Sequence, residues 1–214
     1  MKFLITNDNN QSADLNAKQF HDIKIYYSDD SITWENENGS FILVGSIIGI
    51  RNDNGSINDN ATKEEVINLC KDISNIDLIE GRFACINVDN ANNLSILTDR
   101  FGRFDVYINE SENNIYISSG LDLLPISSES NSHIDNIGLM QAVYIYGSRP
   151  IKKHTSFKNI SRLGVSEKIT FNDNGLKISK ILRNINKDFK YKNEEEGLND
   201  YADRFIESIR ANGS

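Results

Sequence analysis

The segment Asp99-Arg100-Phe101-Gly102 places a carboxylate, a guanidinium and a glycine between two runs of strand-like residues. Hydrogen bonds between ionised groups are roughly twice as strong as those between neutral groups. Glycine tolerates the backbone conformations that close a tight turn. We therefore expect Asp99, Arg100 and Gly102 to anchor a structural elbow between the two strands, and the alternative for the same residues is a ligand site.

The other reactive side chains do not form a recognised catalytic or metal-binding pattern. Cys70 and Cys85 lie in apolar settings without a CxxC pair, so we expect two buried thiols rather than ligands, a disulfide or nucleophiles. His21, His133 and His154 are far apart and lack HxH or HExxH spacing, so we expect surface histidines and no metal site. The sequence contains no P-loop and no GxGxxG motif.

The composition is that of a folded, water-compatible chain. Of the 214 residues, 38% are hydrophobic and 25% are charged, which is enough apolar material for a core. The formal net charge of −8 disfavours a nucleic-acid partner, because phosphate binding needs a basic face. No apolar run is long enough to cross a membrane, and residues 1–10 turn polar too early for a signal peptide. We therefore expect a cytoplasmic location.

The periodicity of the apolar residues predicts mainly strands, grouped in hairpins. The expected strands are Lys2–Thr6, Asp22–Tyr27, Ser31–Glu35, Ser40–Val44 with a continuation over Ile47–Ile50, Arg82–Val88, Leu94–Thr98, Val106–Asn109, Asn114–Ser118, Ser166–Phe171 and Leu176–Ile181. Helices are expected over Lys63–Ser74, Ile137–Tyr146 and Glu194–Arg210. Thr62 and Glu65 form a capping-box pattern at the start of the first helix. Hairpins with few helices predict antiparallel sheets in an α+β sandwich.

Several segments together resemble one known family. IEGRFA followed by LTDRFGRFDVYI, within Ile79–Ile108, is similar to the "LxGxFAxxxxD…xRDRxGxxPLYY" stretch of asparagine synthetases. IYISSGLDLL (Ile115–Leu124) corresponds to their "LxFASExKALL" segment, and Leu139–Ile181 resembles the region that contains "PGH". The resemblance covers Gly39–Arg183 and concerns the N-terminal domain, a class-II glutamine amidotransferase. It implies a four-layer sandwich of two antiparallel β-sheets between helices, the fold of N-terminal-nucleophile hydrolases.

The resemblance also shows where the family's catalytic residues are replaced. Such a glutaminase needs a cysteine at the second encoded position, whose free α-amino group serves as the base once the methionine is removed. This chain has Lys2 there and Val44 in place of the oxyanion-hole asparagine, a donor worth about 2.7–4 kcal/mol to the transition state. Lys63 corresponds to the acidic residue that binds the glutamine α-amine. We therefore expect no catalytic residues in this chain and a degenerate, catalytically silent glutaminase domain.

In the family, a synthetase domain that uses ATP and Mg²⁺ follows the glutaminase domain and forms an amide with release of AMP. The resemblance therefore implies a glutaminase-like domain over residues 1–185, then a linker and first helix over residues 186–214 that lead into this ATP-pyrophosphatase domain. No cofactor is expected in the chain itself. The implied partners are its own synthetase domain and a peptide or small carboxylate substrate, without nucleic acid or membrane, and a homodimer stays open. The alternative is a stand-alone binding or regulatory module without catalysis.

The predicted helix Glu194–Arg210 helps to decide whether the chain leads into a synthetase domain or is a stand-alone module. Its apolar residues recur at helical spacing over more than two turns: Leu198, Tyr201, Ala202, Phe205, Ile206 and Ile209. Burying one large apolar side chain is worth about 1.5–3 kcal/mol, so such a stripe needs a partner surface. If the helix leads into another domain, we expect Phe205 or Ile209 to be exposed within this chain.

Overall fold

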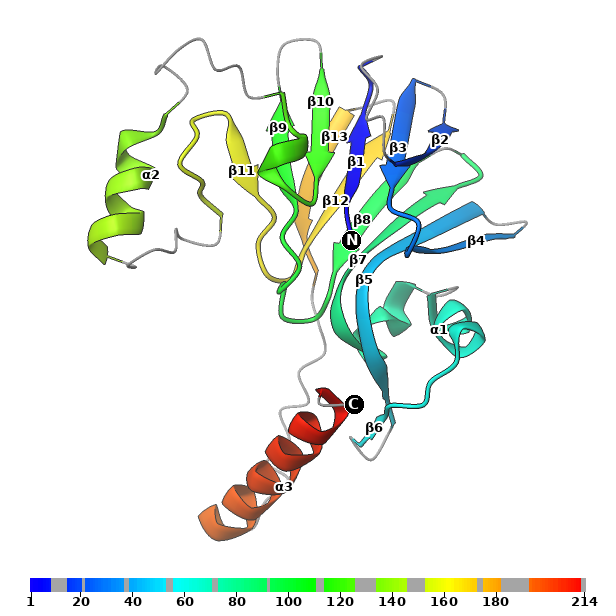
Figure 1. Ribbon diagram of the computed structural model, residues 1–214, viewed down its shortest axis with the longest axis vertical. Helices are drawn as coiled ribbons and strands as arrows, with labels where there is room; N and C mark the ends of the chain where they lie inside the picture. Colours follow the sequence, from blue (N-terminus) through cyan, green and yellow to red (C-terminus); the bar gives the residue numbers. More distant parts are fainter. Residues whose placement is uncertain are drawn as a thin grey trace. The chain divides into compact units, whose positions relative to one another are not determined.

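The structure is a computed structural model that describes twelve stretches of the chain. The described residues are 1–8, 15–20, 22–36, 39–52, 56–70, 73–91, 93–110, 114–125, 134–145, 153–172, 175–181 and 193–212. Most of these residues belong to two antiparallel sheets with few helices (Figure 1). Within the described residues, the structure therefore agrees with the predicted strand-dominated α+β class.

The first sheet has the strand order β11-β9-β10-β1-β3-β2 in the described part of the chain. Its strands are β1 (Phe3–Thr6), β2 (Asn16–Phe20), β3 (Ile23–Tyr27), β9 (Tyr107–Glu110), β10 (Ile115–Ser118) and β11 (Ile160–Arg162). The first strand, β1, lies between β3 and β10, with antiparallel pairing on both sides. The start of the chain is therefore held inside a sheet, and one of its two neighbouring strands, β10, is more than a hundred residues away in sequence.

The second sheet has the order β13-β12-β8-β7-β5-β4, with β6 paired to β5. Its strands are β4 (Ile32–Asn36), β5 (Gly39–Arg51), β6 (Ile57–Asn58), β7 (Ile79–Asp89), β8 (Leu94–Thr98), β12 (Glu167–Asn172) and β13 (Gly175–Lys180). Three hairpins predicted from turn residues are confirmed as strand pairs: β4–β5, β7–β8 and β12–β13. The pair β9–β10 in the first sheet confirms a fourth.

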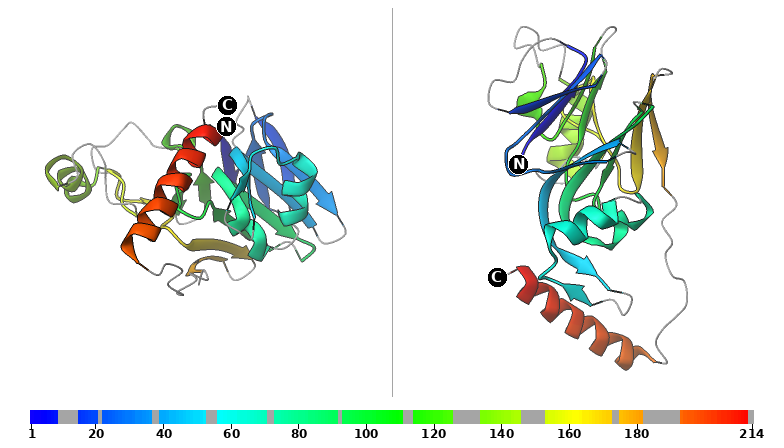
Figure 2. Two further views of the ribbon diagram at one scale, coloured as in Figure 1. Left: turned by 90° about the horizontal axis from the view of Figure 1, so that it is seen from below. Right: turned by 90° about the vertical axis from the view of Figure 1, so that its right-hand side faces the viewer.

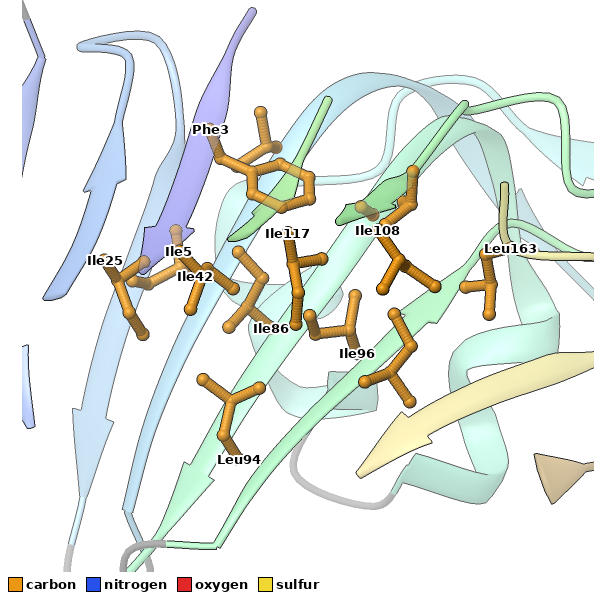
Figure 3. Packing of buried hydrophobic residues seen from close by; sticks show 14 of the residues in the cluster. Phe3, Ile5, Ile25, Ile42, Ile86, Leu94, Ile96, Ile108, Ile117 and Leu163 are labelled. Carbon is orange, nitrogen blue, oxygen red and sulfur yellow. The ribbon is translucent and has the colours of Figure 1, made fainter. Parts of the chain in front are cut away.

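The inner faces of the two sheets share one hydrophobic core. Figure 3 shows Ile5 and Ile117 of the first sheet beside Ile86 and Ile96 of the second. The full cluster of buried residues is Phe3, Ile5, Ile25, Ile42, Val44, Ala84, Ile86, Val88, Leu94, Ile96, Phe104, Val106, Ile108, Ile117, Leu163 and Ile169. Since alternate residues of a strand face opposite sides, these positions define the buried face of each sheet, and the two sheets pack face to face.

The outer face of the first sheet carries a smaller cluster. Leu4, Tyr26 and Tyr116 of this sheet are buried there with Leu124, which follows the short 3-10 helix η2 (Leu121–Leu123). The four-layer arrangement, with helices over both outer faces, is consistent with this packing and stays a prediction.

The helices only partly follow the sequence prediction. Helix α1 (Lys63–Cys70) starts at the predicted capping box: Thr62 N–H donates to Glu65 Oε2 at 2.7 Å, and Glu65 N–H donates to Thr62 Oγ1 at 3.3 Å. It ends before Ser74, and a 3-10 helix η1 (Ile73–Leu78) follows. Helix α2 (Asn136–Met140) continues as a π-helical turn, Gln141–Ile145, so one predicted helix is two short segments.

The last helix, α3 (Glu194–Asn212), is confirmed and is drawn as one uninterrupted helix in Figure 2. Leu198, Tyr201 and Phe205 are 60%, 68% and 56% exposed, and Ile206 and Ile209 are 45% and 56% exposed. The expectation that Phe205 or Ile209 is exposed is therefore met. No helix in the described part of the chain is long and apolar enough to span a membrane.

The chain divides into two compact units. One contains Met1–Gly45 and Arg82–Ile181, and the other contains Ser46–Gly81 together with α3. The first unit holds the shared core, the start of β1 and the Asp99–Gly102 segment. The predicted boundary between residues 185 and 186 lies outside the described residues and stays a prediction.

Candidate functional site

Lys2 lies directly before β1, at the position that the family resemblance gives to the catalytic cysteine. Its ammonium Nζ is 2.5 Å from Asp122 Oδ2, and its backbone N–H donates to Ser28 Oγ at 3.0 Å. The hydrogen bond from Lys2 is the main cause that holds the pKa of Asp122 below its ordinary value. The nucleophile position therefore carries a cation that is paired with an ionised carboxylate.

The surrounding polar groups hold the backbone at the start of the chain. The α-amino group belongs to Met1 and lies 3.9 Å from Asp30 Oδ2. Ser28 Oγ donates to Asp30 Oδ1 at 2.5 Å, and Phe3 N–H donates to Ser119 Oγ at 2.9 Å. We call these residues the amino-end cluster: Met1, Lys2, Ser28, Asp30, Ser119 and Asp122. The hydroxyls and carboxylates of this cluster bond to amines and backbone N–H groups of the chain itself. These bonds hold the start of β1 in place.

Val44, which the family resemblance places at the oxyanion donor, lies in the shared core. Its side chain is fully buried among the apolar residues between the two sheets. An isopropyl group has no N–H to donate, so it cannot stabilise an oxyanion. The next residue, Gly45, has φ +138°, and a Cβ there would lie 2.3 Å from the carbonyl oxygen of Arg82. Close approach of the Arg82 backbone therefore accounts for this glycine without a catalytic role.

The Asp99–Gly102 segment connects β8 of the second sheet to β9 of the first. The Asp99 side chain is 1% exposed, and its carboxylate accepts N–H bonds from Phe101 at 3.1 Å, Arg103 at 3.2 Å and Phe104 at 2.9 Å. Gly102 has φ +58° and its N–H donates to the Asp99 carbonyl at 2.8 Å. These bonds fix four consecutive residues, Phe101 to Phe104, in a tight turn between the two strands.

The charged partner of Asp99 is not the predicted one. Arg103 Nε lies 3.3 Å from Asp99 Oδ1, whereas the guanidinium of Arg100 lies over the ring of Phe101. Arg103 lies over the same ring, and Arg82 Nε donates to the Arg103 carbonyl at 3.1 Å. Two arginines therefore lie over the ring of Phe101, which is 54% exposed, and a third, Arg82, contacts the backbone of Arg103.

The elbow also supports the start of β1. Phe104, whose N–H is held by Asp99, stacks on Phe3 with ring centroids 6.3 Å apart and an interplanar angle of 12°. Phe3 is the residue after Lys2. The buried part of the elbow therefore positions the first strand, while its exposed part presents arginines and an aromatic ring to solvent.

No protein-family model and no curated protein matches the sequence. Among solved structures, glutamine phosphoribosylpyrophosphate (PRPP) amidotransferase from B. subtilis, in complex with ADP and GMP, matches with a TM-score of 0.44 at 14% identity. A structure described as the allosteric regulatory enzyme of purine biosynthesis matches with a TM-score of 0.44 at 13% identity. Each match covers 86% of this chain and 44% of the other chain, so the present chain spans less than half of their length. Both TM-scores lie below 0.5 and assign neither a fold nor an activity to this chain.

The remaining predicted residues are not part of the amino-end cluster, and some of them lie outside the described residues. Cys70 and Cys85 are buried thiols, as predicted. Lys63 is the exposed first residue of α1 and belongs to the second unit. His154 is exposed, as predicted, whereas His21 and His133 lie outside the described residues. Within the described stretches, there is no group of three His, Cys, Asp or Glu side chains that could hold a metal ion.

An apolar crevice lies where β1 ends, at the opposite end of this strand from Lys2. It is lined by Ile5, Thr6, Asn7, Ile23, Leu94, Ile115, Ile117 and Phe171. Among the described residues that line it, Thr6 and Asn7 are polar and none is charged.

Sequence reasoning missed most of the amino-end cluster. Asp122 is 120 residues from Lys2 in sequence, and Ser28 is 26 residues away. No local pattern connects such positions, because the antiparallel pairing of β1 with β3 and β10 brings them together. The contact between Arg103 and Asp99 could have been predicted from the local sequence, because a side chain four residues after Asp99 can fold back over a tight turn.

Proposed function

We propose that this chain is a domain of the class-II glutamine amidotransferase type, with the N-terminal-nucleophile fold, that does not hydrolyse glutamine. The observation that carries the proposal is the Lys2–Asp122 ion pair at the start of β1. Glutamine hydrolysis of this type requires attack by a thiolate on the side-chain amide, with a free α-amine as the base. An ammonium paired with a carboxylate has no lone pair with which to attack.

The residue at the oxyanion position supports the same proposal. Val44 is buried in the shared core, and its side chain has no N–H to donate. Together with Lys2 at the nucleophile position, this replaces two of the groups that the reaction needs.

An assay of glutamate release from glutamine tests whether the chain lacks glutaminase activity. The purified chain is expected to release no more glutamate than a heat-inactivated sample of the same protein. A Lys2→Cys variant, checked by mass spectrometry for loss of Met1, is expected to stay inactive because Val44 still provides no oxyanion donor. Glutamate release by the unmodified chain above the heat-inactivated control would overturn the proposal.

We further propose that the full protein is an asparagine-synthetase-like amide ligase that uses ATP and releases AMP. The exposed apolar stripe of α3 supports this proposal, because a following synthetase domain would supply the missing partner surface. ATP and Mg²⁺ would bind in that domain, which would activate a peptide or small carboxylate. The amine would not come from glutamine hydrolysed by this chain.

The reading frame beyond Ser214 tests this second proposal. An SGGxDS loop in the translated continuation, together with exchange of labelled pyrophosphate into ATP by the full-length protein, is the expected result. A stop codon directly after Ser214 would favour the stand-alone binding or regulatory module. That result would leave the prediction about glutamine hydrolysis in place, because the glutamate assay uses this chain alone.

A further inference from the structure

Helix α2 and the π-helical turn that follows it expose a continuous apolar surface. We call these residues, Asn136–Ile145, the α2 segment; its sequence, NIGLMQAVYI, contains no charged side chain. Half of its residues are large apolar side chains with exposed fractions between 43% and 80%: Ile137, Leu139, Met140, Val143 and Tyr144. Contiguous exposed apolar surface of this kind marks an interaction site.

The opposite side of the α2 segment is fixed to its own chain. Gly138 is buried, and a Cβ there would lie 2.5 Å from the carbonyl oxygen of Thr155. Asp135 N–H donates to the Ser156 carbonyl at 2.9 Å, and its carboxylate accepts from Ile137 N–H at 3.0 Å. Because a helix turns by about 100° per residue, the apolar side chains lie on the side away from Gly138. The apolar side of the segment therefore faces outward.

No strand or helix in the described part of the chain covers this outward side. Figures 1 and 2 both show α2 apart from the strands of the two sheets. A helix this short is not stable through its own hydrogen bonds and relies on packing. The outward side is therefore available to a second surface.

The absence of charge favours a second copy of the chain as the occupant. Each copy has a formal net charge of −8, so two copies repel each other except where few carboxylates meet. The α2 segment has no carboxylate to bring into such a contact. The other exposed apolar stripe, on α3, belongs to a helix whose sequence contains six carboxylates and two arginines, so two copies of α3 would bring like charges together.

The exposed area is sufficient for a weak dimer. At the exposures given above, the five apolar side chains offer on the order of 600 Å², against roughly 800 Å² per partner in a standard interface. In a twofold dimer the same patch faces itself. An antiparallel pairing with the axis near Met140 would place Ile137 of one copy beside Tyr144 of the other.

We propose that the α2 segment is the interface of a symmetric homodimer of this chain. Dimerisation is separate from the chemistry at the amino-end cluster, so this proposal and the lack of glutaminase activity can fail independently.

Sedimentation equilibrium of the full chain tests the proposal. Between about 1 and 500 µM, the mass is expected to rise reversibly from monomer to dimer, with a dissociation constant in the micromolar range. A chain that stays monomeric at every concentration would leave this surface to another domain or to a partner protein and would overturn the proposal. A mass that keeps rising beyond the dimer would contradict a closed, symmetric interface.

Variants with matched charge changes locate the interface. Met140→Glu with Val143→Glu is expected to raise the dissociation constant at least about tenfold, because carboxylates would then meet across the twofold axis. Leu198→Glu with Ile209→Glu makes the same change at equally exposed positions on α3 and is expected to raise it at most about twofold. Equal weakening by the two double variants, or stronger weakening by the α3 variant, would contradict the proposal.

A charge-reversal experiment separates loss of contact from loss of folding. Met140→Lys with Val143→Lys is also expected to be monomeric alone, because ammonium groups would meet across the axis. An equimolar mixture of this variant with Met140→Glu and Val143→Glu is expected to dimerise again, since opposite charges then face each other. A mixture that stays monomeric would show that two α2 segments do not contact each other.

Discussion

The elbow and the amino-end cluster each contain an aspartate paired with a basic side chain, but the two pairs differ in burial. Asp99 is 1% exposed and accepts three backbone N–H bonds besides Arg103. The side chains of Lys2 and Asp122 are 54% and 58% exposed. A buried carboxylate with several donors holds a backbone segment in one conformation, whereas an exposed pair contributes little to stability. The Asp99 carboxylate therefore belongs to a segment that folding requires, whereas Lys2 and Asp122 form a pair that contributes little to folding.

Removal of the elbow carboxylate should have the largest effect. Asp99→Ala leaves the N–H groups of Phe101, Arg103 and Phe104 without their acceptor and removes the partner of Arg103. We expect the free energy of unfolding, measured by urea titration, to fall by about 3–5 kcal/mol. The matched variant Asp122→Ala should cost less than about 1 kcal/mol. Equal losses of unfolding free energy for Asp99→Ala and Asp122→Ala would contradict the claim that only the buried aspartate is needed for folding.

Gly45, the residue after Val44, allows a second test with a somewhat smaller expected effect. Gly45→Ala would place a Cβ 2.3 Å from the Arg82 carbonyl oxygen at a φ of +138°, so we expect a loss of at least about 2 kcal/mol in the free energy of unfolding. The control is Gly175→Ala, where φ is +94° and no atom lies within 4 Å. Only backbone strain, about 1 kcal/mol, should appear there. A neutral Gly45→Ala would show that packing does not require this glycine.

Tyr116 and Asp8 form a third polar pair, at the end of β1 opposite to Lys2. Its hydroxyl donates to Asp8 Oδ2 at 2.7 Å, and burial, followed by this bond and the negative charge of Asp8, raises the pKa of Tyr116 to about 12. Because the folded pKa is raised, the stabilisation is complete below the unfolded value near 10 and is lost as the pH rises through about 12. Tyr116→Phe should therefore cost about 1 kcal/mol at neutral pH.

Ultraviolet absorbance of the phenolate measures this shift. One tyrosine of the folded chain should ionise near pH 12, and this component should be missing from Tyr116→Phe. Loss of the component in another tyrosine variant, with Tyr116→Phe unchanged, would show that the assignment is wrong.

The smallest effect is expected at Lys2 itself. Lys2→Met removes the ammonium from Asp122 and should change the free energy of unfolding by less than about 1 kcal/mol. The lowered pKa of Asp122 has a definite sign: the pair stabilises the fold above the ordinary value of 3.8, and this contribution is lost as the pH falls through the folded pKa. The Asp122 carboxyl carbon, followed by NMR, should titrate at a higher pH in Lys2→Met than in the unmodified chain. An unchanged titration would mean that the pair does not form in solution.

Local patterns predicted many elements of the fold well. The alternation of LSILT gave β8 with its observed bounds, and the Thr62–Glu65 pattern gave the start of α1. The edge strand β2 was missed because NAKQF is mostly exposed and has no apolar alternation. Helix α1 was predicted too long, because apolar residues continue into the 3-10 helix η1 at a spacing that resembles helical periodicity.

The site was less predictable than the fold, for a physical reason. Lys2 and Val44 were singled out because the family resemblance fixes their positions in sequence, and their roles stay a prediction. The partners of Lys2 depend on strand pairing over more than a hundred residues, which no local periodicity encodes. At the elbow, the position was predicted but the charged partner was not, because the turn directs Arg100 over Phe101 and Arg103 toward Asp99.

The most direct test of the central claim is covalent labelling at the start of β1. A glutamine analogue with an electrophilic diazoketone in place of its side-chain amide alkylates the nucleophile of a working glutaminase site. The intact mass of the purified chain, measured after incubation with this analogue, is expected to equal that of a sample incubated with glutamine. A single adduct that maps to Met1 or Lys2, and that excess glutamine prevents, would contradict the account, because it would show a glutamine pocket with a reactive group at the chain's amino end.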